Sequence, residues 1–124
     1  GILAAIAIPV FMNQRKKAWE TSAKADVSTI GKEVAAYYVD GTGALSISAS
    51  GAGGTWTLEK SDGTDVATGK LSPGNQVAGS IPDSTTYCVA VQHVTDGGAD
   101  PWEYVAAEGL QPSTDTCGAT VPTS

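Results

Sequence analysis

The chain has 124 residues, a length that fits one domain and excludes two, because a domain usually takes about 100 to 200 residues. Hydrophobic residues make up 41% of it and charged residues 16%, which excludes a chain disordered by composition and a polytopic membrane protein. Seven basic and thirteen acidic side chains give a net charge of −6. We therefore expect no direct, strong binding of nucleic acid, whose phosphates require a basic surface.

Residues 1–12 form a continuous apolar run, and Arg15, Lys16 and Lys17 follow shortly after it. A run of 12 residues cannot span a bilayer, which takes about 20 residues in a helix. Basic residues directly after such a run are typical of the headgroup edge of a membrane segment. Because the chain begins with Gly1 and not with Met, we expect the run to be the end of a longer hydrophobic helix cut at Gly1; a short buried helix is the alternative.

Residues 13–38 repeat apolar side chains every three or four positions, the spacing of one face of a helix. The residues of this apolar stripe, which we expect to pack on a sheet, are Trp19, Ala23, Val27, Ile30, Val34 and Tyr37 or Tyr38. Charged side chains such as Asp26 fall off the stripe, and Asp40, Gly41 and Gly43 end the pattern. We predict a helix over residues 1–40, of which residues 1–18 project and residues 19–40 pack on a head formed by residues 41–124.

The head shows the two-residue period of strands after a Gly, Ser and Ala-rich loop at 43–54. Residues 55–60 and 64–70 flank Ser61-Asp62-Gly63, and an Asp-Gly pair between alternating segments is a strong hairpin signal. Residues 85–94 and 102–107 form a second pair around Asp96-Gly97-Gly98. These four segments predict an antiparallel meander that lies on the helix stripe, so the fold class is α+β.

Cys88 and Cys117 are the two cysteines of the chain. Two thiols and a single histidine are too few ligands for a closed zinc site. A disulfide is favoured, because Cys88 lies in a predicted strand and Cys117 in a Ser, Thr and Pro-rich tail that has little else to hold it. A disulfide implies an oxidising compartment outside the cytoplasm.

The sequence shows no motif of an active site, so we expect no enzyme, no cofactor and no metal. His93 stands alone on a strand, where a solvent-facing side chain is the simplest interpretation. The pairs Asp62 with Asp65 and Asp96 with Asp100 lack the ligand count of a calcium loop and are better explained as turn residues. The tryptophans are the residues that a sugar would stack on, although packing anchors are the favoured interpretation: Trp19, Trp56 and Trp102.

The apolar run 1–11 followed by Asn-Gln-Arg-Lys-Lys-Ala at 13–18 resembles the second half of the N-terminal helix of type IV pilins and pseudopilins. Tyr87-Cys88-Val89 and Glu108-Gly109-Leu110-Gln111-Pro112, which leads to Cys117, are similar to the C-terminal part of pilins from Gram-positive, especially actinobacterial, species. The two segments cover about 40 residues, and the middle of the chain carries no resemblance. The family's prepilin peptidase cuts and N-methylates before a phenylalanine that would lie upstream of Gly1.

The resemblance implies the type IV pilin fold and a structural subunit of a pilus, or fimbrium, used for adhesion, twitching motility or DNA uptake. Its partners would be copies of itself, the pilus assembly machinery and the prepilin peptidase. The subunit would lie in the cytoplasmic (inner) membrane as a monomer and on the cell surface as a filament. The resemblance assigns assembly to the apolar residues Gly1, Ile2, Leu3, Ile6, Ile8, Pro9, Val10 and Phe11.

Two other functions stay open. A major pseudopilin of a type II secretion system is the alternative within the family; the cysteines argue against it, because the resemblance implies that such pseudopilins bind calcium and lack this disulfide. The alternative of another class is an extracellular enzyme or carbohydrate-binding module that the helix tethers to a membrane. A tether needs hydrophobicity alone, whereas the apolar stripe continues about 20 residues past the apolar run.

Pro9 interrupts the apolar run at its centre. Proline donates no hydrogen bond to the carbonyl of Ala5 and crowds it, which weakens a helix by about 3 kcal/mol relative to alanine. Related pilins lose helix between the residues that match Gly1 and Pro9 when they assemble. We therefore predict that residues 1–9 are helical or frayed in the isolated chain and partly extended in a filament.

Overall fold

The computed structural model describes residues 2–113 and 116–124, and of residues 2–12 and 116 it describes the backbone alone. The predicted α+β class is confirmed, with antiparallel strands that follow a long helix. The elements in chain order are α1 (Ile2–Tyr37), β1 (Leu45–Ala49), β2 (Thr55–Lys60), β3 (Asp65–Lys70), β4 (Asn75–Ser80), β5 (Cys88–His93), β6 (Trp102–Val105), β7 (Gly109–Pro112) and the 3-10 turn η1 (Thr116–Gly118).

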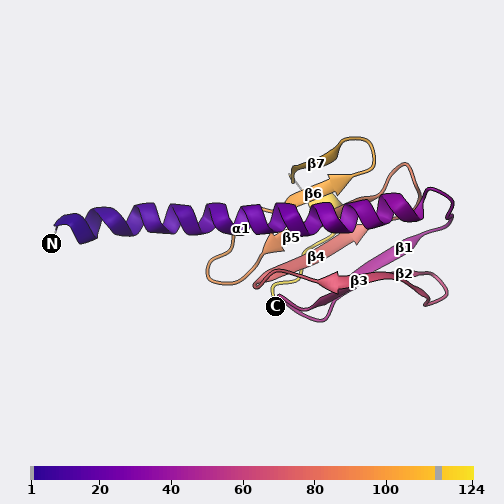
Figure 1. Cartoon of the computed structure of the whole chain (residues 1–124), viewed down its shortest axis with the longest axis horizontal. Helices are drawn as coiled ribbons and strands as arrows, with labels where there is room; N and C mark the ends of the chain where they lie inside the picture. Colours follow the sequence, from indigo (N-terminus) through magenta and orange to yellow (C-terminus); the bar gives the residue numbers. More distant parts are fainter. Residues whose placement is uncertain (1, 114–115) are drawn as a thin grey trace.

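α1 has 36 residues and is therefore about 54 Å long at about 1.5 Å per residue. Its C-terminal half lies across the strands, whereas its N-terminal half extends well beyond every other element (Figure 1). The helix continues through Pro9, so residues 2–9 are helical here, and Gly1 lies outside the described residues. The helix ends at Tyr37, where the backbone N–H of Gly41 donates to the Tyr37 carbonyl at 2.8 Å.

The apolar stripe of α1 packs against the head. Ala23, Val27, Ile30 and Val34 have no exposed surface. They share one core with residues of both sheets, among them Leu58, Val89 and Val91. Trp19 and Tyr37, at the two ends of the stripe, are half-buried. Full burial of a large aliphatic side chain stabilises a fold by about 1.5 to 3 kcal/mol, so the stripe is the main attachment of the helix.

The strands form two antiparallel sheets, in the orders β1-β2-β3 and β4-β5-β6-β7. The predicted hairpin is confirmed as β2 and β3, which join at Ser61-Asp62-Gly63, where Gly63 has a φ of 86°. A bridge between Leu45 and Ile81 connects β1 to the end of β4. α1 contacts β4, β5, β6 and β7, so the second sheet is the one that carries the helix.

The single four-stranded meander predicted from the sequence is wrong, because the predicted strands divide between the two sheets. The segment 43–54, predicted as a loop, contains β1, in which Leu45, Ile47 and Ala49 alternate with exposed serines. β4 and β7 were not expected. β4 lacks alternation because four consecutive residues, 75–78, are buried, which requires cover on both faces of the sheet.

The C-terminal segment provides the second cover. Val121 is 5% exposed and packs with Ala78 and Ala90, on the sheet face opposite to the helix. The side chain of Gln76 donates to the backbone carbonyl of Ser124 at 2.7 Å and thereby holds the segment. The second sheet is thus the middle of three layers, between α1 and residues 117–124.

Replacing Gly31 by alanine will lower the free energy of unfolding by about 1 to 3 kcal/mol, as overpacking does. A Cβ atom at position 31 would overlap three ring carbons of Tyr104, and the gain in helix propensity of about 1 kcal/mol does not offset this. Urea unfolding measures the change. The neighbouring exposed substitution Lys32→Ala is the control and should stay within about 0.5 kcal/mol; equal effects of the two would contradict the packing assignment.

Candidate functional site

The projecting half of α1 carries most of the predicted assembly residues. The backbone of residues 2–11 is helical there, and Gly1 lies outside the described residues. Residues 13, 14 and 16–18 are exposed, so the head does not cover the part of the helix that lies between it and the apolar run. Within the part of the chain that is described, no helix is both long and apolar enough to cross a bilayer.

The neck, where α1 leaves the head, is held by three stacked side chains. Trp19 lies parallel to the ring of His93, with ring centroids 4.2 Å apart and planes at 8°. The guanidinium of Arg15 lies 5.0 Å from the Trp19 ring centre, within reach of a cation–π interaction. The expectation of a solvent-facing His93 is wrong: the side chain is 4% exposed, because the helix covers it through Trp19.

Below this stack, a polar cluster joins the helix to β4. Asn75, which has no exposed surface, donates through Nδ2 to Asp26 Oδ2 at 2.8 Å and to Ser22 Oγ at 3.2 Å. Asp26 also accepts from the backbone N–H of Ser72 at 2.7 Å and from its hydroxyl at 2.9 Å. Asp26 therefore anchors the loop before β4 to the helix, a role that its place off the apolar stripe did not indicate.

The same cluster defines the protonation of His93. Both Nδ2 hydrogens of Asn75 are donated to the helix, so its Oδ1 accepts from His93 Nδ1–H at 3.3 Å. The neutral ring then accepts through Nε2 from the Thr95 hydroxyl at 3.1 Å. Burial lowers the pKa of His93 below its usual value and Arg15 acts in the same direction, while Asp96 and a hydrogen bond to the Pro73 backbone oppose them. The neutral imidazole is the form that fits this site.

Stability should fall as the pH drops below about 6.5, the usual histidine pKa that the unfolded chain retains. The folded chain binds the proton less readily, so the contribution of His93 is complete above that pH and decreases below it. Urea unfolding at about pH 7.5 and about pH 5.5 measures the difference, which should be smaller in His93→Gln. Hydrogen bonds from Thr64 and Thr85 lower the pKa values of Asp62 and Asp83, which places their titration below this range. An identical pH dependence in the variant would contradict the assignment.

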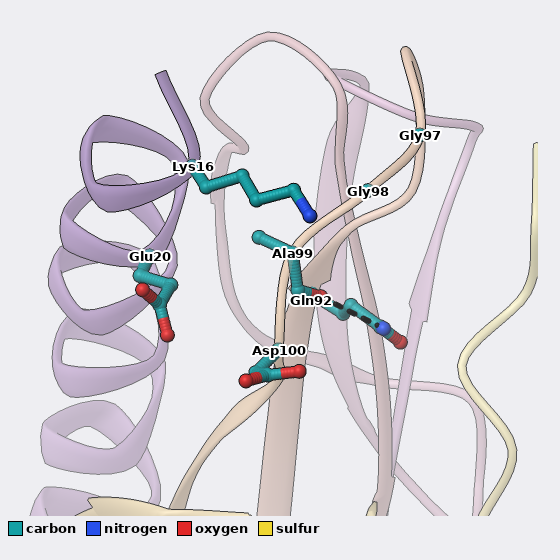
Figure 2. A pocket seen from close by; sticks show the side chains of 7 residues that line it. All are labelled: Lys16, Glu20, Gln92, Gly97, Gly98, Ala99 and Asp100. Carbon is teal, nitrogen blue, oxygen red and sulfur yellow. Dashed lines mark hydrogen bonds between the residues drawn. The ribbon is translucent and has the colours of Figure 1, made fainter. Parts of the chain in front are cut away.

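A polar cleft of about 300 Å³ lies beside the neck, between α1 and the loop that connects β5 to β6. Its lining consists of Lys16, Glu20, Gln92, Gly97, Gly98, Ala99 and Asp100. Lys16 extends across the cleft toward the loop, and Glu20 and Asp100 lie on opposite walls (Figure 2). Gln92 donates to the Ala99 carbonyl at 2.9 Å and so fixes the loop. The lining offers charge but neither a thiol, a hydroxyl nor an imidazole.

The aspartates singled out as sparse calcium ligands do not gather into one site. Asp62 accepts from the backbone N–H of Thr64 at 2.9 Å inside the β2–β3 turn, as its interpretation as a turn residue requires. Asp96 has a φ of 55° in the β5–β6 loop, a conformation that aspartate tolerates in turns. Asp100 faces the polar cleft.

The three tryptophans do not form one sugar-binding platform. Trp56 is 4% exposed within the core, with Gly69 against its ring. Trp102 is half-buried, and the Lys24 ammonium lies 4.1 Å from its ring centre. Trp19 stacks on His93 at the neck. Each ring is thus engaged in the attachment of an element of the fold.

The predicted disulfide is confirmed: Cys88, at the start of β5, is bonded to Cys117 in η1, with Cα atoms 5.6 Å apart. The bond pins the tail against the sheet face that Val121 covers. Glu103 on β6 lies beside both sulfurs, and no sequence pattern indicated that position. Comparison of the chain with protein-family models, with curated proteins and with solved structures gives no match.

Proposed function

We propose that this chain is a structural subunit of a type IV pilus-like filament and has the type IV pilin fold. The observation that carries the proposal is the division of α1: its C-terminal half is attached to the head through Ala23, Val27, Ile30 and Val34, while its apolar N-terminal half projects (Figure 1). A projecting apolar helix needs a membrane or neighbouring helices around it, because exposed apolar surface drives association.

The composition of the N-terminal half of α1 favours close packing between helices. Gly1, Ala4, Ala5 and Ala7 are small residues that let helices approach closely in an apolar surrounding. The subunit would lie in the cytoplasmic membrane through this helix and then pack with its copies in a filament core, with the heads outside. The disulfide-pinned tail agrees with an extracellular location, since such bonds persist in oxidising compartments.

The two alternative functions predict different phenotypes of the cell. A major pseudopilin of type II secretion would form a short periplasmic filament, so its loss would stop protein secretion and leave surface filaments unchanged. A tethered enzyme or carbohydrate-binding module would coat the surface as single molecules. The neck favours a filament subunit, because a mere tether requires neither the Trp19–His93 stack nor the Asp26 anchor.

The test is made in the organism that encodes the chain, by deleting the gene and restoring it with variants. Ile8→Glu, inside the apolar run, should abolish filaments that antibodies against the head label on the cell surface, because a buried unpaired carboxylate is costly. The matched control is Gln14→Glu, an exposed position of the projecting half, which should retain them. An even coat without filaments indicates the tether, and lost secretion with intact surface filaments indicates the pseudopilin.

Filaments of a Pro9→Ala variant should stretch less under load than those of the parent. α1 is helical through Pro9 in the isolated chain, and proline weakens that stretch by about 3 kcal/mol relative to alanine. Filament imaging and force–extension measurements provide the comparison. Unbroken helix through residues 1–12 in parent filaments, or equal extension of the two kinds, would refute the predicted opening between Gly1 and Pro9.

A further inference from the structure

Glu103 places a buried carboxylate against both cysteines. Its side chain is 5% exposed, although ionisable side chains are rarely buried without a strong partner. Oε1 accepts from Gln111 Nε2 at 2.8 Å. Oε2 lies 3.3 Å from Cys117 Sγ and 3.7 Å from Cys88 Sγ. Disulfide sulfurs carry no hydrogen, so toward the closed bridge these two contacts are not hydrogen bonds, and the position of Oε2 calls for another explanation.

The carboxylate oxygen lies at the distance from each sulfur that separates two ligands of a tetrahedral cation, although the sulfurs themselves are bonded to each other. Bond lengths to zinc of about 2.3 Å for sulfur and about 2.0 Å for a carboxylate oxygen, at an angle of about 109°, separate these two ligands by about 3.5 Å. The observed separations of Oε2 from the sulfurs, 3.3 and 3.7 Å, lie on either side of that value. The one-atom ligand positions of the three residues all fall within 4.8 Å of one another.

We propose that the reduced chain binds a zinc-type divalent cation through Cys88, Cys117 and Glu103, before the disulfide forms. In the reduced chain the two sulfurs are no longer bonded, and to bind the cation they must move apart to about 3.8 Å, the separation of two thiolates on one zinc ion. Gln111 acts as a positioning residue, because its bond to Oε1 turns Oε2 toward the sulfurs. Both cysteines are half-buried, so solvent reaches part of the site.

No reductant is needed to produce the two thiols, because cysteines are synthesised in the reduced form. Binding converts two thiols into thiolates and releases two protons to solvent, while the carboxylate binds as the anion. Oxidation then joins the sulfurs by exchange with a disulfide-bearing oxidoreductase. The two electrons reduce the disulfide of that oxidoreductase to a dithiol, which takes up two protons, and the cation leaves because disulfide sulfurs are poor ligands.

The bound cation would hold η1 against the sheet during the interval in which no covalent bond does so. Cys117 belongs to η1, Cys88 to β5 and Glu103 to β6, so the cation would link η1 to β5, as the disulfide later does, and to β6 as well. The inference does not depend on the filament proposal.

The test uses the 124-residue chain in mild detergent with a phosphine reductant, titrated with Co²⁺ and then with Zn²⁺. We expect the charge-transfer and d–d bands of a four-coordinate thiolate–cobalt site, their loss on addition of Zn²⁺, and a rise of the Tm of the reduced chain with the cation. The disulfide-bonded chain should show none of the three. An absent four-coordinate spectrum, or equal binding by the oxidised chain, would overturn the proposal.

Glu103→Gln keeps the side-chain shape and should weaken Co²⁺ binding at least about tenfold, as loss of a supporting partner already does. The matched control is Glu108→Gln, an exposed position with the same change of charge, which should bind like the parent. Gln111→Ala provides a second variant, expected to weaken binding by about tenfold through a freed carboxylate. Parent-like affinity in both Glu103→Gln and Gln111→Ala would leave two cysteines alone as ligands and so refute the assignment.

Discussion

Replacement of Cys88 and Cys117 together by serine is expected to lower the free energy of unfolding by about 3.6 kcal/mol. The two cysteines are 29 positions apart, and a cross-link over about 30 residues reduces the entropy of the unfolded chain by that amount in the chain-entropy model. The tail that covers Ala78 and Ala90 loses its covalent attachment at the same time. Urea unfolding of the parent and the variant measures the difference.

The reduced parent, in reductant and a chelator, is the control for this result. It keeps both cysteines and should unfold close to the serine variant, which separates the loss of the bond from the loss of the sulfur atoms. Hydrogen exchange should increase most in residues 117–124, which lose their covalent attachment, and in β4, which loses its cover. A change below about 1 kcal/mol would show that the tail stays in place without the bond.

Asp26→Ala is expected to lower the free energy of unfolding by about 3 kcal/mol. The substitution removes three hydrogen bonds, from the backbone and hydroxyl of Ser72 and from the amide of Asn75. Hydrogen bonds to a charged group contribute about 1.5 to 3 kcal/mol each. Because Asp26 is half-buried, water replaces part of them, whereas the fully buried Asn75 amide stays poorly satisfied.

Glu33→Ala is the matched control for Asp26→Ala, since it removes a carboxylate from an exposed position of the same helix. It should change the free energy of unfolding by less than about 0.5 kcal/mol. Asp26→Asn should fall between the two, because its amide oxygen can still accept from the Ser72 N–H and from Asn75, while the charge is lost and an NH₂ group replaces the oxygen that accepts from the Ser72 hydroxyl. Equal effects of Asp26→Ala and Glu33→Ala would show that the anchor contributes nothing to stability.

Local patterns determined the elements that bury one face only. The three-to-four spacing of Val27, Ile30 and Val34 placed the attachment of the helix, because burial on one side of a helix imposes that period. The Asp62-Gly63 turn placed the β2–β3 hairpin, since glycine adopts the positive φ that the turn requires. The cysteine count and the composition of the tail indicated the disulfide.

Tertiary structure alone decided which strand is covered on both faces and which residues from distant segments come into contact. β4 lost its period because Val77 faces the helix and Ala78 faces the tail, so successive residues are buried for different reasons. His93 was expected to face solvent, Asp26 falls off the apolar stripe, and no pattern singled out Glu103. In the structure His93 meets Trp19, Asp26 meets Ser72 and Glu103 meets both sulfurs. Each of these contacts joins residues at least 14 positions apart in the chain, a separation that a period of two or 3.6 residues does not record.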